Sequence, residues 1–320
     1  MTTETEELLW IGSQEYKLIP RDIVLFGLKN KKTMFELLTA DVSFFNGVNN
    51  KTLEKFLQNR ENIPFEQYHK IYDQMKKDHV NLITCCDPLF PSYLKESDQQ
   101  GHPILLYHQG EKMKFDNCVA VVGTRNCSTQ AVEFARELGR GLSEIGYVIV
   151  AGLARGIDAA AHRGAISIGG MTIAVLPWFH QPYPPEHERL LEEIKKNGCV
   201  ISENFFQSKF TDKYKFIERN SIISGISNVV IAVESSFSGG TRWQVEIALA
   251  QGKQVIAMEP EKDNELAYDG FRKFLQKGAK KASTIPEAIE IIKREAKIKE
   301  SSLDEFNSDV EIELKTLQKT

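Results

Sequence analysis

The regular alternation of short apolar runs and helix-type segments from Cys118 onward constrains the fold most strongly. The apolar runs predict strands at 118–122, 147–151, 171–176, 199–202, 229–234 and 254–258. Helical periodicity fills the gaps, at about 130–145, 157–168, 186–197, 216–226 and 242–251. This alternation predicts a doubly wound α/β fold, in which a mostly parallel sheet carries helices on both faces. Such sheets bind their ligands beyond the carboxyl ends of the strands.

Three of the predicted strands end in turns of small residues that also carry a cation or a hydroxyl. The turns are Gly123-Thr124-Arg125 with Ser128 as a helix cap, Gly152 and Gly156 around Arg155, and Ser238-Gly239-Gly240-Thr241. Glycine lets the backbone approach an anion closely, and the exposed N–H groups at a helix start attract phosphate. Three such turns at neighbouring strand ends predict a phosphorylated or polyanionic ligand.

A polar and aromatic segment, FFQSKFTDKYKFIERNSIISGIS, occupies residues 205–227. Its cations Lys209, Lys213, Lys215 and Arg219 interleave with rings that include Phe216. This composition is typical of surfaces on which bases stack and phosphates form ion pairs. An aromatic core contact flanked by solvated lysines has the same composition, so composition alone leaves both interpretations open.

Several familiar catalytic motifs are absent from the sequence. Neither of the first two turns has G-x-G-x-x-G spacing with a carboxylate about 20 residues onward, which argues against an NAD-dependent dehydrogenase. P-loop and G-x-S-x-G motifs are absent too, so ATP hydrolysis and α/β-hydrolase chemistry are not predicted. His162 lacks a second histidine or cysteine at ligand spacing, so we expect a structural histidine, no metal and no cofactor. Asp158 is expected to cap the following helix or to orient an arginine.

Charge and targeting signals set further limits. The net charge of −4 over 320 residues argues against a protein that coats nucleic acid with its whole surface, but it permits a local basic groove. The five cysteines show no C-x-x-C spacing, so neither a disulfide framework nor a zinc site is expected. The N-terminus lacks a signal-type pattern and no apolar run approaches membrane-spanning length. We therefore expect a cytoplasmic protein with no membrane partner.

The chain divides into three predicted regions. Residues 1–79 show helical periodicity with turn-like breaks, one of them at 44–48, and predict a small helical domain. Such a domain is either a cap without a ligand or a module that grips a DNA backbone or another protein. Residues 80–284 form the main domain, which begins with an edge strand at 82–84 and a second strand at 102–107. Residues 285–320 start as a helix and continue as a polar tail that is helical or partly disordered.

The motifs, in this order and spacing, resemble those of the DNA-processing protein A (DprA/Smf) family of bacterial single-stranded DNA binders. The resemblance rests on VVGTRNCS, GLARGIDAAAH, the Tyr183-Pro184 loop, ISEN, FIERNSIISGIS and SGGT, across roughly residues 80 to 260. It implies an extended Rossmann-like domain, preceded by a sterile-alpha-motif-like helical domain, which binds single-stranded DNA without enzymatic activity. It also implies homodimerisation and a role in natural transformation or recombination, with help in loading a RecA-type recombinase.

The resemblance also assigns roles to residues. Arg125 with Gly123, Thr124 and Ser128 would grip a phosphate, Arg155, Lys215 and Arg219 would line the same groove, and Phe216 would stack on a base. Asn220 would hold the loop or contact the DNA backbone.

The sequence departs from the family pattern at three places. The usual Arg-Asn-Arg is Arg219-Asn220-Ser221, which removes one cation. The Ser-Gly-Ser turn is SGGTRWQVE, with Arg242 and Trp243 in unexpected positions, and no winged-helix pattern follows.

Two other functions also fit the sequence. SGGT followed by Glu246 is similar to the turn and glutamate of LOG-type nucleotide phosphoribohydrolases, which release a base from a nucleotide. A nucleotide-sensing module of the same superfold, in a defence or mobile-element system, is the other alternative.

Overall fold

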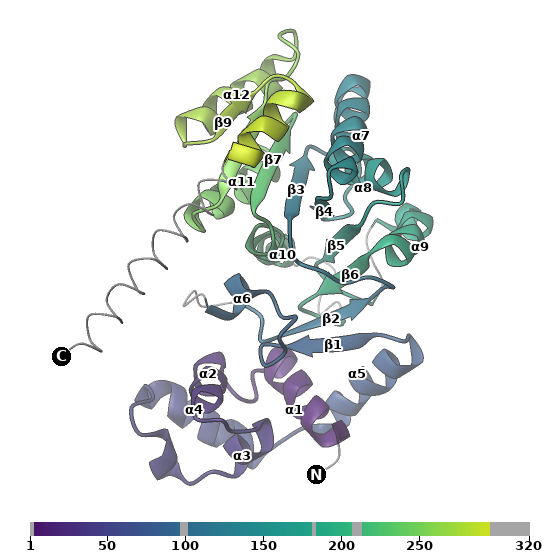
Figure 1. The fold of residues 1–320 in the computed structure, drawn as a ribbon. Helices are drawn as coiled ribbons and strands as arrows, with labels where there is room; N and C mark the ends of the chain where they lie inside the picture. Colours follow the sequence, from purple (N-terminus) through teal and green to yellow (C-terminus); the bar gives the residue numbers. More distant parts are fainter. Residues whose placement is uncertain (1–2, 97–101, 181–183, 207–212, 295–320) are drawn as a thin grey trace, which may run out of the picture.

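A central sheet with helices on both faces dominates the computed structural model, which describes residues 3–96, 102–180, 184–206 and 213–294 (Figure 1). Within these residues the sheet order is β1-β2-β6-β5-β4-β3-β7-β8-β9. The strands are β1 (Asn81–Thr84), β2 (Leu105–Gln109), β3 (Cys118–Gly123), β4 (Val148–Ala151), β5 (Thr172–Leu176), β6 (Cys199–Ser202), β7 (Val229–Val233), β8 (Gln254–Met258) and β9 (Lys280–Ala282). Only β2 pairs antiparallel with its neighbours β1 and β6, so the sheet is mostly parallel and the predicted fold class is confirmed.

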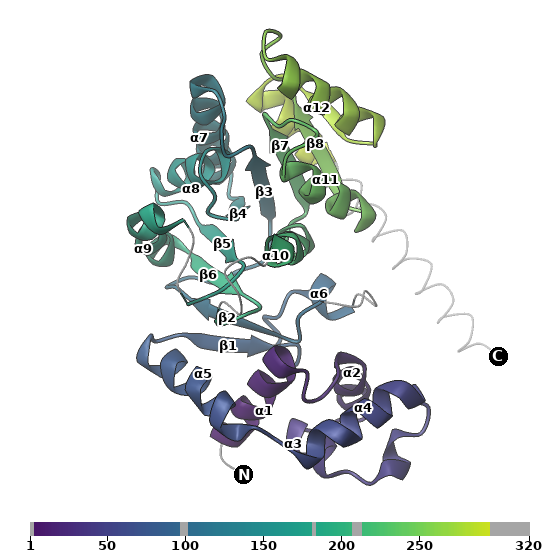
Figure 2. The same ribbon diagram turned by 180° about the vertical axis from the view of Figure 1, so that it is seen from behind.

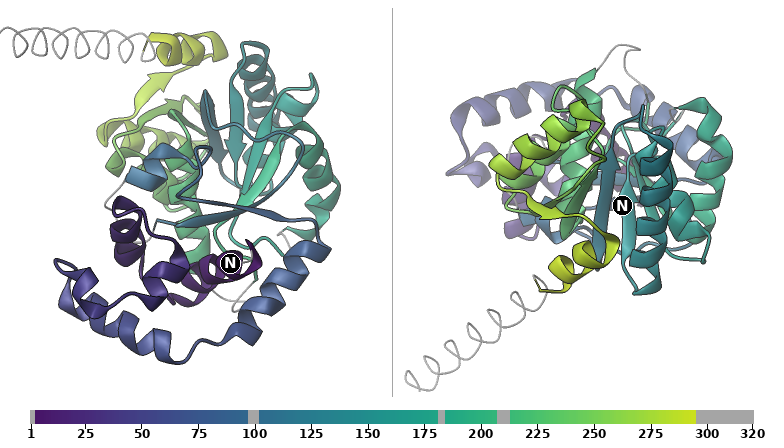
Figure 3. Two further views of the ribbon diagram at one scale, coloured as in Figure 1. Left: turned by 60° about the horizontal axis from the view of Figure 1, so that its bottom comes forward. Right: turned by 90° about the horizontal axis from the view of Figure 1, so that it is seen from above.

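The strands are apolar on both sides because each face of the sheet is covered. Val119 and Val121 of β3 pack with α7 (Thr129–Glu144) and α8 (Ile157–Ile166). Ala120 and Val122 face the opposite layer, which contains α10 (Lys213–Ile226), α11 (Thr241–Ala250) and α12 (Glu265–Gln276). The 3-10 helix η2 (Pro185–His187) leads into α9 (Glu188–Asn197), which packs on β5 and β6. Seen from behind and from above, the helices flank the sheet on both sides (Figures 2 and 3).

The predicted alternation agrees with the structure between residues 118 and 258, but three features differ. The helix predicted to begin at 216 starts at Lys213, and the strand predicted at 102–107 lies at Leu105–Gln109. No strand or helix is predicted between residues 259 and 284 of the main domain, whereas α12 and β9 lie there and β9 extends the sheet. The strand β9 is only three residues long with two exposed lysines, too short for a recognisable apolar run.

The N-terminal region is helical, as predicted. It contains α1 (Thr3–Tyr16), α2 (Arg21–Lys29), α3 (Met34–Thr39), η1 (Val42–Phe45), α4 (Asn50–Glu61) and α5 (Phe65–Lys77). The residues predicted as a turn at 44–48 complete η1 and then turn at Gly47, whose φ is +94°. Phe45 and Phe56 meet edge to face with ring centroids 5.5 Å apart, which closes this small core.

The N-terminal helices are bonded to the sheet region through α1 and α2. Gln14 Oε1 accepts from the Ile104 N–H at 3.0 Å, and Glu15 Oε1 accepts from the Phe205 N–H at 2.8 Å. Arg21 donates to the carbonyl of Pro103 at 3.0 Å. These bonds fix the helices beneath β1 and β2, beside the short helix α6 (Ser92–Glu96) (Figure 1). The boundary at residue 79 stays a prediction.

The far end of the described chain is a helix at 285–294, whose Ala288 and Ile292 are buried with the α7 layer. The predicted polar tail beyond residue 294 and Tyr183 lie outside the described residues. None of the helices described is both long and apolar enough to span a membrane.

Candidate functional site

The site is built where the order of the strands reverses, between β3 and β7. After β3 the chain adds β4, β5 and β6 on one side and then crosses back to place β7 on the other. The turns that leave β3 and β7 therefore diverge and open a crevice at their carboxyl ends. The Thr124 N–H donates to the Glu234 carbonyl at 3.1 Å and joins the two turns. Gly123 is required here, since a side chain would overlap the Val233 carbonyl and Ile157.

A cleft of about 570 Å³ occupies this crevice. Its walls are the turn after β3, one face of α10 and the start of α11, and α10 and α11 lie side by side (Figure 2). Nine of the residues predicted from the sequence line it: Gly123, Thr124, Arg125, Phe216, Arg219, Asn220, Gly239, Gly240 and Thr241.

A buried arginine lies in the wall of the cleft. Arg219 is only 6% exposed, and burial lowers its pKa to about 10 although the nearby Asp158 carboxylate favours the charged form. Asp158 accepts hydrogen bonds from the N–H groups of Gly152, at 2.9 Å, and Ala154, at 3.4 Å. It therefore holds the turn after β4 and faces Arg219, while Gly156 occupies the N-cap position of α8. Of the two roles expected for Asp158, the structure favours the one directed at an arginine.

An exposed arginine and an aromatic ring form the edge of the cleft. Arg125 Cζ lies 5.5 Å from the centroid of the Phe216 ring. Trp178 meets the same ring edge to face, with centroids 5.3 Å apart. Since Arg125 is exposed, its guanidinium is available to an anion that enters the cleft beside the ring.

The turn after β4 forms a small hollow that adjoins the cleft and shares Arg125, Phe216 and Arg219 with it. Gly152 and Arg155 line this hollow, and Arg155 forms an ion pair with Glu186. Gly156 has φ +74°, and a Cβ there would lie 2.6 Å from the Thr124 carbonyl oxygen. The glycine thus lets the second turn pack directly against the first.

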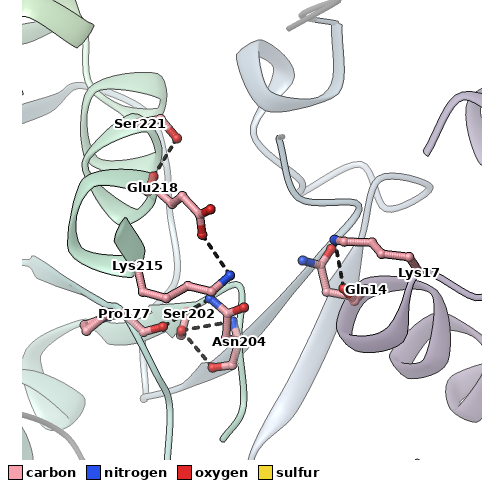
Figure 4. Close-up of polar contacts among 8 residues, drawn as sticks. All are labelled: Gln14, Lys17, Pro177, Ser202, Asn204, Lys215, Glu218 and Ser221. Carbon is pink, nitrogen blue, oxygen red and sulfur yellow. Dashed lines mark hydrogen bonds and ion pairs between the residues drawn. The ribbon is translucent and has the colours of Figure 1, made fainter. Parts of the chain in front are cut away.

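Besides Gly156, three residues predicted for the groove line neither the cleft nor the hollow. The Ser128 hydroxyl donates to Glu234 Oε2 at 2.6 Å and accepts from the Ala131 N–H at 3.1 Å, so it caps α7 outside the cleft. Lys215 forms an ion pair with Glu218 at 2.8 Å, near Ser202 and Asn204 (Figure 4). Ser238 is exposed, with its hydroxyl 3.3 Å from that of Ser236. Of the interleaved lysines, Lys209 lies outside the described residues.

Two of the residues that depart from the family pattern or suggest another function lie outside the cleft. Ser221 does not line the cleft, and its hydroxyl donates to the Glu218 carbonyl at 2.6 Å. Glu246 forms ion pairs with Arg242 and Lys277, each at 3.0 Å, and these contacts lower its pKa even though burial opposes the shift. Glu246 is also absent from the cleft lining, so the structure does not bring the glutamate of the phosphoribohydrolase alternative to the site.

Several residues of the cleft lining were not predicted from the sequence, and two of them, Trp243 and Gln244, belong to α11. Both belong to the first turn of α11, directly after the Gly239-Gly240 pair. Helical spacing could have predicted both residues. Positions three and four residues apart share one face of a helix, and Trp243 and Gln244 follow Gly240 at those intervals.

The sequence of the chain matches a family model and curated relatives. The model described as DNA recombination-mediator protein A matches residues 81–293. DNA processing protein DprA of Streptococcus pneumoniae is 32% identical over 250 residues, which cover 77% of this chain and 83% of that protein. DNA processing protein DprA of Bacillus subtilis is 31% identical over 208 residues, 64% of this chain and 69% of that protein.

Solved structures agree with the sequence matches. The X-ray structure of DprA from Streptococcus pneumoniae aligns with a TM-score of 0.69 at 25% identity, over 90% of this chain and 98% of that chain. A structure of DNA processing protein A from Helicobacter pylori, from work on its single-stranded DNA binding mode, has a TM-score of 0.58 at 26% identity. It covers 68% of this chain and 96% of that chain. The family match spans every turn that forms the cleft, and the chain belongs to the DNA recombination-mediator protein A family.

Proposed function

We propose that the chain binds single-stranded DNA in the cleft between β3 and β7, as a protein of DNA processing, transformation or recombination. The observation that carries this proposal is the convergence of Arg125, Arg219 and two glycine turns around Phe216. The single-stranded DNA binding described for the Helicobacter pylori relative supports it.

The chemistry of the cleft suits a single strand. A phosphate that enters the cleft would meet the exposed Arg125 guanidinium beside the turn after β3. A base beside that phosphate would meet Phe216, and stacking requires a base face that a duplex keeps covered. Phosphate contacts carry no sequence information, so binding is expected to be tolerant of sequence.

The remaining roles inferred from the sequence form part of the same proposal. Gly152 and Arg155 would extend the phosphate path into the adjoining hollow. A RecA-type recombinase and a second copy of the chain are the proposed protein partners, and the cytoplasm is the proposed compartment. We propose a binding role without catalysis, and two observations support it. Asp158 is the only acidic side chain among the described residues of the cleft lining, and it is held by backbone N–H groups.

A binding titration with oligo-dT and a duplex of equal length, at two salt concentrations, tests the function. We expect a preference for the single strand, and an affinity that falls with salt at a slope of about −0.7 per phosphate neutralised. Equal binding of both forms, or no salt dependence, would contradict the proposal. Tight binding of one mononucleotide without DNA affinity would favour the sensor alternative. Base release from nucleoside monophosphates would favour the phosphoribohydrolase, provided that it disappears in Glu246→Gln.

A further inference from the structure

The first turn of α11 presents an aromatic ring to the cleft that no role described so far uses. Trp243 lines the cleft and is 45% exposed, whereas Trp10 and Trp178 are 5% and 3% exposed. The sequence contains three tryptophans, so Trp243 is the one whose indole is open to solvent. Arg242 Cζ lies 5.2 Å from the centroid of the Trp243 ring and supports it from its own helix. The ring is therefore a positioned aromatic surface on the wall formed by α11.

The same wall contains a buried polar atom that lacks a partner. Gln244 lines the cleft, is 2% exposed, and donates from Nε2 to the Asn220 carbonyl at 3.0 Å. That bond fixes the amide, because only the nitrogen can donate, and it leaves Oε1 as a buried acceptor. Within the described part of the chain, neither Gln244 Oε1 nor Arg219 Nε has a hydrogen-bond partner. A buried polar atom without a partner is costly, so a ligand in the cleft that supplied either hydrogen bond would relieve that cost.

The donor and acceptor pattern identifies the chemical class of that ligand. A phosphate oxygen only accepts hydrogen bonds, so it can pair with Arg219 Nε but not with Gln244 Oε1. A nucleobase edge carries both N–H donors and carbonyl or ring-nitrogen acceptors, and it can pair with both atoms. Its flat face also matches an indole ring.

We propose that the α11 side of the cleft is a nucleobase subsite, formed by Trp243, Gln244 and Arg219. A base lies against the Trp243 ring and presents its hydrogen-bonding edge to Gln244 Oε1 and Arg219 Nε. The subsite rests on the proposed binding of single-stranded DNA and makes it more specific. It adds a base position at α11 to the phosphate at Arg125 and the base at Phe216.

Affinity measurements on Trp243 variants test the subsite with two probes, oligo-dT and an abasic oligonucleotide of the same length. We expect Trp243→Ala to weaken oligo-dT binding by roughly five- to 100-fold, the range for one lost stacking contact. Abasic binding should be unchanged by the same substitution, and Trp243→Phe should restore most of the oligo-dT affinity. Phe35→Ala, which removes a 40% exposed ring on α3, is the matched control and should leave both affinities unchanged.

Tryptophan fluorescence gives a second readout that a structural role would not change. Oligo-dT should quench the exposed indole of Trp243, and the abasic oligonucleotide should not. Quenching should fall strongly in Trp243→Phe although binding persists. Quenching as large in Trp243→Phe as in the unmodified protein would overturn the subsite.

The outcomes separate the subsite from the function on which it rests. Oligo-dT affinity that is unchanged in Trp243→Ala but reduced in Arg125→Ala would overturn the subsite and leave single-stranded DNA binding intact. Equal losses for oligo-dT and the abasic probe in Trp243→Ala would also overturn it, since the residue would then act on the backbone or on the fold. If the unmodified protein binds neither probe, both the proposed function and the subsite fail.

Discussion

The backbone of Gly152, at the end of β4, lies directly against the guanidinium of Arg219 on α10. A Cβ at residue 152 would occupy the space of Arg219 Nη1. Two motifs that are 67 residues apart in the sequence, by the difference of these residue numbers, thus meet at one wall of the cleft. Because Gly152 has no side chain, the long, buried side chain of Arg219 can reach the cleft. The glycine therefore contributes to binding as well as to the backbone turn.

Gly152→Ala tests this relationship. The added methyl group has to displace Arg219, and we expect oligo-dT affinity to fall nearly as far as in Arg219→Ala. Overpacking a buried site also costs stability, about 1–3 kcal/mol. Binding titrations and thermal unfolding measure the two effects, and the double variant should bind no more weakly than Arg219→Ala alone. Gly141→Ala is the control, since its Cβ would meet nothing closer than 3.7 Å. Full additivity of the two substitutions would show that Gly152 and Arg219 act separately.

Lys215→Ala tests whether Lys215 contacts DNA, as the sequence predicts, or lies outside the binding cleft, as the structure indicates. Lys215 forms an ion pair with Glu218 and does not line the cleft, so we expect oligo-dT affinity to stay within roughly threefold of the unmodified protein. A loss as large as that of Arg125→Ala would place the DNA path on the other face of α10.

The pH dependence of stability is expected to report on Glu203, at the end of β6. Glu203 is 6% exposed, and burial raises its pKa to about 7 against the attraction of Lys215. A carboxyl group with a raised folded-state pKa stabilises the protein fully below its unfolded pKa of about 4.5 and loses this contribution as pH rises through about 7.

Glu203→Gln removes this titration. Its free energy of unfolding should exceed that of the unmodified protein by an amount that grows from pH 5 to pH 8 and reaches on the order of 1–3 kcal/mol. Denaturant unfolding at both pH values measures the difference. Glu133→Gln, at a 62% exposed side chain on α7, should show no such trend. If the difference in free energy of unfolding between Glu203→Gln and the unmodified protein stays constant from pH 5 to pH 8, the pKa of Glu203 is not raised by burial.

The fold could be predicted because it depends on local pattern. Strands such as β3 and β7 are covered on both faces and therefore appear as short apolar runs, and their glycine turns mark the strand ends. The directions of single side chains were harder to predict. Phe216, Arg219, Asn220 and Ile223 share one face of α10 at helical spacing, and Lys215 is one residue out of phase with them. The helical spacing of these four residues can be read from the sequence. The composition of the segment does not distinguish them from Lys215, because it counts every cation equally.

Other contacts of the site depend on residues far apart in the chain. Ser128 is turned away from the cleft by Glu234, whose backbone has an unusual φ of +28°. Nothing near Ser128 in the sequence indicates this partner, because it lies 106 residues away. The position of Gly152 against Arg219 is likewise set by the packing of α10 on the sheet.

The central claim is that Arg125 holds a DNA phosphate at the edge of the cleft. The salt dependence of oligo-dT binding tests it most directly, measured for the unmodified protein, Arg125→Ala and the control Arg189→Ala, whose side chain is 93% exposed on α9. We predict that Arg125→Ala weakens binding by roughly 10- to 100-fold and lowers the magnitude of the salt slope by about 0.7. Arg189→Ala should change neither quantity. An unchanged affinity and slope in Arg125→Ala would contradict the account.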